Sequence, residues 1–208
     1  MTDAVKRQYA ALRADWDNGL AGELKRSAIA FLILYLLAFG LCAALPDLRN
    51  TLVSRAVSTI ENMAVTDENG ALSALALFSN NLRACGVIML YGLIPFILLP
   101  ALSLGVNAML LGVLGSWYLA EGISMAAYFA ALIPHGIFEL PALISAFAVG
   151  LYACGQTTGL VRRQEGCRSV WECVILISRV LTLIQLPLLA VSALVEAYVT
   201  PVIASFFL

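Results

Sequence analysis

The sequence predicts an all-α protein: a polytopic transmembrane helical bundle of about five spans, with Pro-broken helices and a surface amphipathic helix. Hydrophobic residues make up 62% of the 208 residues, and charged residues only 12%. A soluble domain of this length has too little interior to bury so many apolar side chains. The apolar residues also form long continuous runs, whereas a transmembrane barrel shows alternating segments of about ten residues.

The charges, cysteines and histidine exclude several other classes of protein. Twelve Lys and Arg residues stand against thirteen Asp and Glu residues, so the chain lacks the basic excess of a nucleic-acid-binding protein. Its five cysteines are an odd number and lie mostly inside apolar runs, which argues against a disulfide framework. Because the chain has a single histidine, we expect no metal site, and we expect no cofactor.

Residues 1–27 predict a cytoplasmic amphipathic helix, because apolar residues recur there at helical spacing among charged ones. The first span follows over 28–45, a run of 18 residues without a charge, and Pro46 ends it. Residues 46–81 form the long polar connection, in which we expect a helix lying on the membrane surface. A turn over 67–70 follows it. The segment 28–208 is predicted to be a single transmembrane domain.

The second span is predicted over 82–99 and the third over 102–119, with a short apolar helix over 71–78 before them. Proline should bend or end the second span, because it lacks the amide hydrogen that a helix interior needs. Pro95 should kink this span and Pro100 should close it. An asparagine before the span should cap its first turn. The candidates are Asn80 and Asn81.

The apolar run over 124–155 is too long for one straight crossing, and it contains Pro134 and Pro141. Proline restricts the residue before it as well as its own position. We therefore expect a break at Pro134, with a separate half-helix over 124–133 and a fourth span over 135–155.

The last apolar run predicts one kinked fifth span over 173–194 and a C-terminal segment at the far surface, with a sixth crossing as the alternative. With five spans and the N-terminus in the cytoplasm, eight Lys and Arg residues lie inside and three lie outside. Positive residues concentrate on the cytoplasmic side of membrane proteins. This count predicts a cytoplasmic N-terminus and an extracytoplasmic segment over 46–81.

The candidate site consists of ionisable and amide side chains in and beside the predicted spans. His135 and Glu139 are four residues apart, so they share one helix face, and an ionisable group in a membrane needs a partner. We expect Glu139 to accept a hydrogen bond from His135, from Arg83 or from an asparagine, and so to fix the second span against the fourth. A transport or catalytic role is the alternative. The full set is His135, Glu139, Arg83, Asn80, Asn81 and Asn107.

Small residues recur every four positions along the predicted fourth span, which lets another helix approach closely. They are Ala142, Ala146 and Gly150. The chain contains no P-loop, nucleophile elbow or zinc-protease motif. We therefore expect no enzymatic activity, and an intramembrane hydrolase built on His135 is the least favoured hypothesis.

Three motifs give the chain a resemblance to a known family. Residues 79–83 read Ser-Asn-Asn-Leu-Arg, residues 105–107 read Gly-Val-Asn, and residues 134–141 read Pro-His-Gly-Ile-Phe-Glu-Leu-Pro. In this order they are similar to the stage II sporulation protein M family, and the last motif is the most specific. The resemblance covers roughly residues 28–195. The family commonly has Asn-Gly in the third span, where this chain has Asn-Ala.

The resemblance implies a bacterial cell-membrane protein without a known catalytic activity. The sporulation member of the family helps the mother-cell membrane engulf the forespore, and it holds two peptidoglycan-degrading proteins, the stage II proteins D and P, at that membrane. The resemblance therefore implies a scaffold for cell-envelope proteins. Its partners would be the lipid bilayer and peptidoglycan hydrolases, and a homo-oligomer stays open. The alternative is a small-solute or lipid transporter that uses the broken helices around His135 and Glu139.

Overall fold

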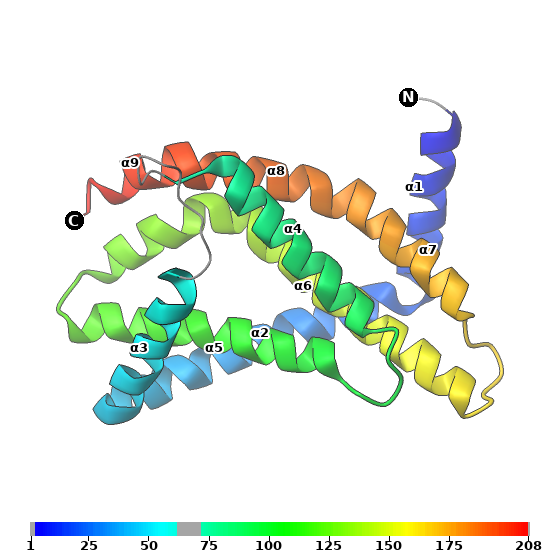
Figure 1. Cartoon of the computed structure of the whole chain (residues 1–208), viewed down its shortest axis with the longest axis horizontal. Helices are drawn as coiled ribbons and strands as arrows, with labels where there is room; N and C mark the ends of the chain where they lie inside the picture. The colour runs from blue at the N-terminus through cyan, green and yellow to red at the C-terminus, as the bar shows by residue number, and fades with distance from the viewer. Residues whose placement is uncertain (1–2, 62–71, 208) are drawn as a thin grey trace. The chain divides into compact units, whose positions relative to one another are not determined.

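The computed structural model describes residues 3–61 and 72–207, and the regular elements within these ranges are all helices (Figure 1). Five helices of the described residues are long and apolar enough to cross a membrane. They are Val5–Ala44, Ala74–Tyr91, Leu99–Ala120, Met125–Val161 and Val170–Ala204. The predicted all-α, polytopic fold is therefore confirmed.

The helices form two compact units, each assembled from three separate parts of the chain. Unit 1 contains Met1–Ile29, Leu82–Leu104 and Pro141–Leu188, and unit 2 contains Ala30–Asn81, Gly105–Leu140 and Leu189–Leu208. The predicted division into an N-terminal helix and a single transmembrane domain stays a prediction. The two units are described separately below.

A kink rather than a loop separates α1 (Asp3–Asp15) from α2 (Ala21–Ala44). Asn18 and Gly19 leave helical geometry there, and Gly19 has a φ of 115°. Glycine adopts this left-handed backbone conformation without the steric cost that a side chain would bring. The predicted first span over 28–45 lies within α2 except for Leu45, and α2 itself begins earlier, directly after the kink.

α3 (Pro46–Glu61) is the helix predicted within the polar connection. Pro46 stands at its first position, where the missing amide hydrogen would have had no partner in the helix. The predicted turn over 67–70 lies outside the described residues. The short helix predicted over 71–78 does not form by itself, because residues from Ala74 onward belong to α4 (Ala74–Tyr91).

The predicted second span over 82–99 is wrong at both ends. α4 ends at Tyr91, and the irregular segment 92–98 follows it before α5 (Leu99–Ala120) begins. Pro95 lies in this irregular segment, so it separates two helices instead of kinking one. Pro100 occupies the first turn of α5, where the amide hydrogen that proline lacks would have had no partner in the helix. The predicted third span over 102–119 lies wholly within α5.

Side chains of α6 (Met125–Val161) bind the irregular segment 92–98 within unit 1. Non-helical backbone in a membrane protein must be shielded and hydrogen-bonded by the protein itself. The contacts are Thr157 Oγ1 to the Gly92 carbonyl oxygen at 3.3 Å, Cys154 Sγ to the Ile94 and Ile97 carbonyl oxygens at 3.5 and 3.7 Å, and the Phe96 amide to Thr158 Oγ1 at 2.9 Å.

Glycines bring the backbones of unit 1 together at the same place. A Cβ atom at Gly150 would lie 2.8 Å from the Ile88 carbonyl oxygen and 2.9 Å from Pro100 Cγ. A Cβ atom at Gly92 would overlap the Gly150 carbonyl group. Both other members of the predicted small-residue stripe, Ala142 and Ala146, are fully buried in α6.

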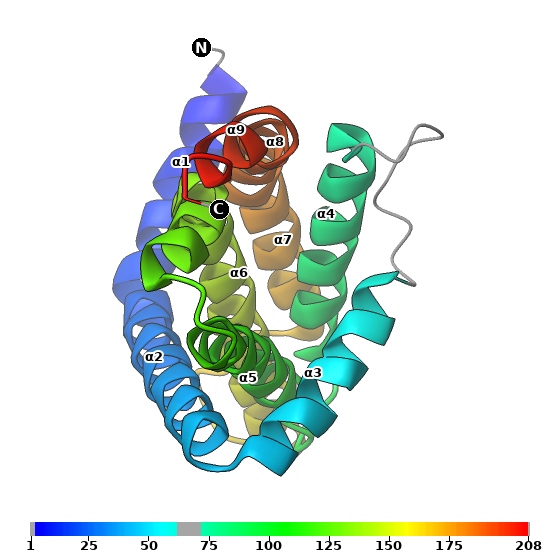
Figure 2. The ribbon, with the colours of Figure 1, turned by 90° about the vertical axis from the view of Figure 1, so that its left-hand side faces the viewer.

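In unit 2, a glycine lets α5 cross α2 closely (Figure 2). A Cβ atom at Gly112 would lie 2.6 Å from the Tyr35 carbonyl oxygen and 2.8 Å from the Phe39 amide nitrogen. The Tyr128 hydroxyl of α6 donates to the Leu111 carbonyl oxygen of α5 over 3.0 Å. The first half of α6 is thereby joined to α5.

The predicted break at Pro134 is wrong. α6 is continuous from Met125 to Val161, and both Pro134 and Pro141 lie inside it. The half-helix over 124–133 and the span over 135–155 therefore form one helix. Each proline removes one backbone hydrogen bond, but neighbouring helices and hydroxyl side chains can satisfy freed carbonyl groups in membrane helices.

The last helical run, Val170–Ala204, is one candidate span of 35 residues. α7 (Val170–Val180), α8 (Leu186–Leu194) and α9 (Thr200–Ala204) are joined by π-helical turns at Leu181–Gln185 and Val195–Val199. Each π-helical turn ends two residues before a proline. Because proline has no amide hydrogen, the α-helical hydrogen-bond pattern lacks a donor at that residue. The run is continuous beyond the predicted span over 173–194, and within the described residues it does not divide into two crossings.

One buried carboxylate ties α1 to α7 within unit 1. Asp15 is 6% exposed, and it pairs with Arg168 at 2.7 Å and with Arg179. Arg179 also donates to Gln8 over 3.0 Å. Burial by itself lowers the pKa of the Arg168 guanidinium, but the hydrogen bond to Asp15 and the negative charge of that carboxylate, with smaller contributions from Tyr152 and Cys173, together outweigh it. This pKa therefore lies above its ordinary value.

Gly150→Ala should destabilise the protein by about 1–3 kcal/mol, because the added methyl group has no room between helices. Gly155→Ala is the matched control, since nothing lies within 4 Å of a Cβ atom at that position of the same helix. Thermal unfolding in detergent, followed by circular dichroism, measures both. Equal midpoints for the two variants would contradict the close approach at Gly150.

Asp15→Asn should destabilise the protein by about 2 kcal/mol, because it leaves two arginines without their carboxylate. The loss is smaller than for a fully buried pair, since the side chains of Arg168 and Arg179 are 22% and 13% exposed. The control is Asp17→Asn at an exposed position. Chemical unfolding in detergent compares them, and an unchanged Asp15→Asn curve would show that the network adds no stability.

Candidate functional site

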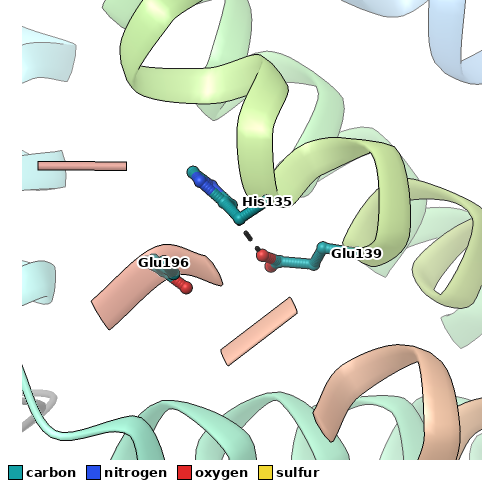
Figure 3. Close-up of side chains that lie close together, drawn as sticks. All are labelled: His135, Glu139 and Glu196. Carbon is teal, nitrogen blue, oxygen red and sulfur yellow. Dashed lines mark ion pairs between the residues drawn. The ribbon is translucent and has the colours of Figure 1, made fainter. Parts of the chain in front are cut away.

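Five polar side chains of unit 2 lie together where the first half of α6 meets the C-terminal helical run, and we call them the polar cluster. Figure 3 shows three of them, one pair from α6 and a glutamate from the C-terminal run. The members from α6 are one helical turn apart, and those from the C-terminal run recur every four residues. The polar cluster is His135, Glu139, Ser192, Glu196 and Thr200.

Two hydroxyl groups of the C-terminal run position His135. Nδ1 of the imidazole lies 3.2 Å from Thr200 Oγ1, and the Ser192 hydroxyl donates to the His135 carbonyl oxygen over 3.3 Å. Thr200 is buried, with 8% of its surface exposed. Because Thr200 engages Nδ1, the other ring nitrogen of His135 is left to face Glu139.

His135 and Glu139 form a close pair, as their spacing predicts, but not a direct hydrogen bond. Nε2 of His135 lies 4.0 Å from a carboxylate oxygen of Glu139, which is longer than any protein hydrogen bond. An atom or ion between the imidazole and the carboxylate would join them.

Glu196 completes the cluster from the π-helical turn Val195–Val199. One ligating atom each from His135, Glu139 and Glu196 lies within 4.8 Å of the other two. Oε2 of Glu196 is buried, and it has no hydrogen-bond partner among the described residues. Two ionised carboxylates this close repel each other unless a proton or a cation lies between them.

The other predicted site residues lie outside the polar cluster. Arg83 is exposed on α4 in unit 1, and its pairing with Glu139 stays a prediction. Asn80 and Asn81 lie inside α4, so the predicted cap is wrong, because a helix is capped from the residue before it. The Ser73 hydroxyl accepts from the amide of Ala76 at this end instead. Asn107 lies inside α5, partly exposed.

A comparison with protein families identifies the chain. A family model described as stage II sporulation protein M matches residues 27–201, which include all five helices counted as candidate spans in whole or in part and the entire polar cluster. The chain belongs to the stage II sporulation protein M family. The resemblance carried by the three sequence motifs is therefore confirmed. Nothing matches the chain among curated proteins or among solved structures.

This stage II sporulation protein M family member is a multi-pass membrane protein, as its apolar helices and its family indicate. The hydrolase hypothesis stays a hypothesis, and the hydroxyl beside the His135 ring in unit 2 belongs to Thr200. Ser192 contacts the backbone carbonyl of His135 rather than its ring.

Sequence reasoning missed the C-terminal half of the polar cluster in this family member. The signal was present, because Ser192, Glu196 and Thr200 are spaced by four residues and so share a helix face. This is the same periodicity that drew attention to the small-residue stripe of α6. What the sequence does not show is that this polar face lies against His135 and Glu139.

Thr200→Val should lower the unfolding free energy by about 0.5–1 kcal/mol, the usual worth of a hydrogen bond between membrane helices. Valine keeps the shape of threonine and removes the hydroxyl that contacts His135. The control is Thr182→Val, at an exposed position of the same helical run whose hydroxyl bonds only to its own helix. Thermal unfolding in detergent measures both, and a larger loss from Thr182→Val would argue against the contact.

Proposed function

We propose that the protein is a non-enzymatic scaffold in the cell membrane that positions peptidoglycan-remodelling proteins, as in forespore engulfment during sporulation. The observation that carries the proposal is the family match over residues 27–201, because the sporulation member of this family holds such proteins at the membrane. The absence of a recognisable catalytic motif in the sequence agrees with it.

We assign the docking surface for these partners to α3. This helix carries Asp47, Arg49 and Arg55 and is not among the candidate spans of the described residues. With the N-terminus in the cytoplasm, as the positive residues favour, α3 lies on the outer side, where peptidoglycan is found. Leu48 and Val57 of α3 are 40% and 43% exposed, so apolar side chains are available to a partner.

The transporter alternative loses its main argument. Discontinuous helices often line substrate sites in transporters, and the sequence suggested such a break beside His135. α6 is instead continuous through Pro134 and Pro141. We therefore retain the scaffold as the single proposed function.

A photo-reactive amino acid at Val57 of α3 tests the proposal in native membranes. The expected result is covalent capture of cell-envelope proteins, peptidoglycan hydrolases among them, identified by mass spectrometry. The control places the same photo-reactive group at Glu165, an exposed residue of the loop between α6 and α7. Capture of the hydrolases from Glu165 alone would reverse the proposed orientation, and capture from neither position would refute the scaffold.

A further inference from the structure

We propose that His135, Glu139 and Glu196 bind one divalent transition-metal ion of the Zn²⁺ or Mn²⁺ class. This inference does not rest on the scaffold proposal. One ligating atom from each of these three side chains lies within 4.8 Å of the other two. Within residues 3–61 and 72–207, the structure brings no other set of three His, Cys, Asp or Glu side chains this close together. The imidazole comes from α6 with one carboxylate, and the second carboxylate comes from the C-terminal run (Figure 3).

The ligand set has the chemistry of a first-row metal site. Imidazole nitrogen suits Zn²⁺ and its neighbours in the first transition row, and carboxylate oxygen suits Mn²⁺ as well as Zn²⁺. Mg²⁺ and Ca²⁺ prefer sites made of oxygen alone. One nitrogen and two carboxylates therefore favour a transition metal over these two ions.

The spacing of the three side chains fits a shared ion after small adjustments. Metal bonds to these ligands are about 2.0–2.2 Å long, so two ligands of one tetrahedral ion lie roughly 3.4 Å apart. The His135–Glu139 distance of 4.0 Å and the overall limit of 4.8 Å are each within about 1.5 Å of that value. Rotation of the two flexible glutamate side chains can supply this change without moving a helix.

Neighbouring hydroxyl groups hold the histidine in the way that metal sites require. A metal-binding histidine usually engages its second ring nitrogen with a neighbouring polar group, which fixes the tautomer and the ring orientation. Thr200 does so at Nδ1 of His135, which leaves Nε2 for the metal. Ser192 supports the same residue at its backbone, because its hydroxyl donates to the His135 carbonyl oxygen over 3.3 Å. The C-terminal run therefore holds the histidine at two points.

Charge balance gives the strongest reason for an ion at this place. Two ionised carboxylates in a membrane protein are costly unless they are paired. One divalent cation neutralises both, and a neutral imidazole adds no charge. The ion would also satisfy Oε2 of Glu196, a buried atom without a hydrogen-bond partner among the described residues. Bound there, it would fasten the C-terminal run of unit 2 to α6.

The test measures metal binding by the purified full-length protein in detergent after removal of metals with a chelator. Isothermal titration with Zn²⁺ and, separately, electron paramagnetic resonance with Mn²⁺ should each show one ion per chain. Mn²⁺ is the stricter probe, because Zn²⁺ also binds the thiolates of cysteines and Mn²⁺ prefers oxygen. Both ions should raise the melting temperature of the wild-type protein, because the three ligands converge only in its folded state.

Glu196→Gln and Glu139→Gln should each weaken binding at least tenfold and abolish the shift in melting temperature. The matched control is Glu165→Gln at an exposed carboxylate, which should bind like the wild type. Circular dichroism establishes that each variant folds, and if one fails to fold the other decides. Wild-type affinity in both cluster variants, or no binding of either ion by the wild type, would overturn the proposal.

Discussion

Every polar backbone group of this protein that lies in the membrane has to find its hydrogen-bond partner inside the protein, because lipid offers none. Helices meet this demand along their length, and most of the described chain is helical. The irregular segment 92–98 does not meet it by itself. Thr157 and Cys154 of α6 bond to its carbonyl groups, and glycines at 92 and 150 bring the backbones close enough for them to do so.

The need to satisfy every backbone group also explains how each proline affects its helix. Where neighbouring groups can accommodate a proline, as in the interior of α6, the helix continues through it. In the C-terminal run, a π-helical turn precedes each proline. The second of these turns carries Glu196 and ends directly before Thr200. A local response to proline therefore sets the position of two members of the polar cluster.

The polar cluster and the proposed scaffold are compatible, because they concern different parts of unit 2. The polar cluster joins α6 to the C-terminal run through Thr200 and Ser192, whereas α3 offers the exposed surface. A scaffold needs rigid helices to present a docking surface, and a metal ion bound by carboxylates from two segments would provide rigidity. Neither role requires the protein to carry out a reaction.

The sequence by itself determined the class of protein, the number of long apolar helices and the family, because composition, run length and the motif over 134–141 are local properties. It also determined the one-turn spacing of His135 and Glu139. Only the tertiary structure decided that α6 passes through Pro134, that Pro95 separates α4 from α5, and that Glu196 joins the cluster. The effect of a proline depends on the neighbours that replace its lost hydrogen bond. The meeting of Glu196 with Glu139 depends on how two distant helices pack, and no local pattern in the chain encodes that.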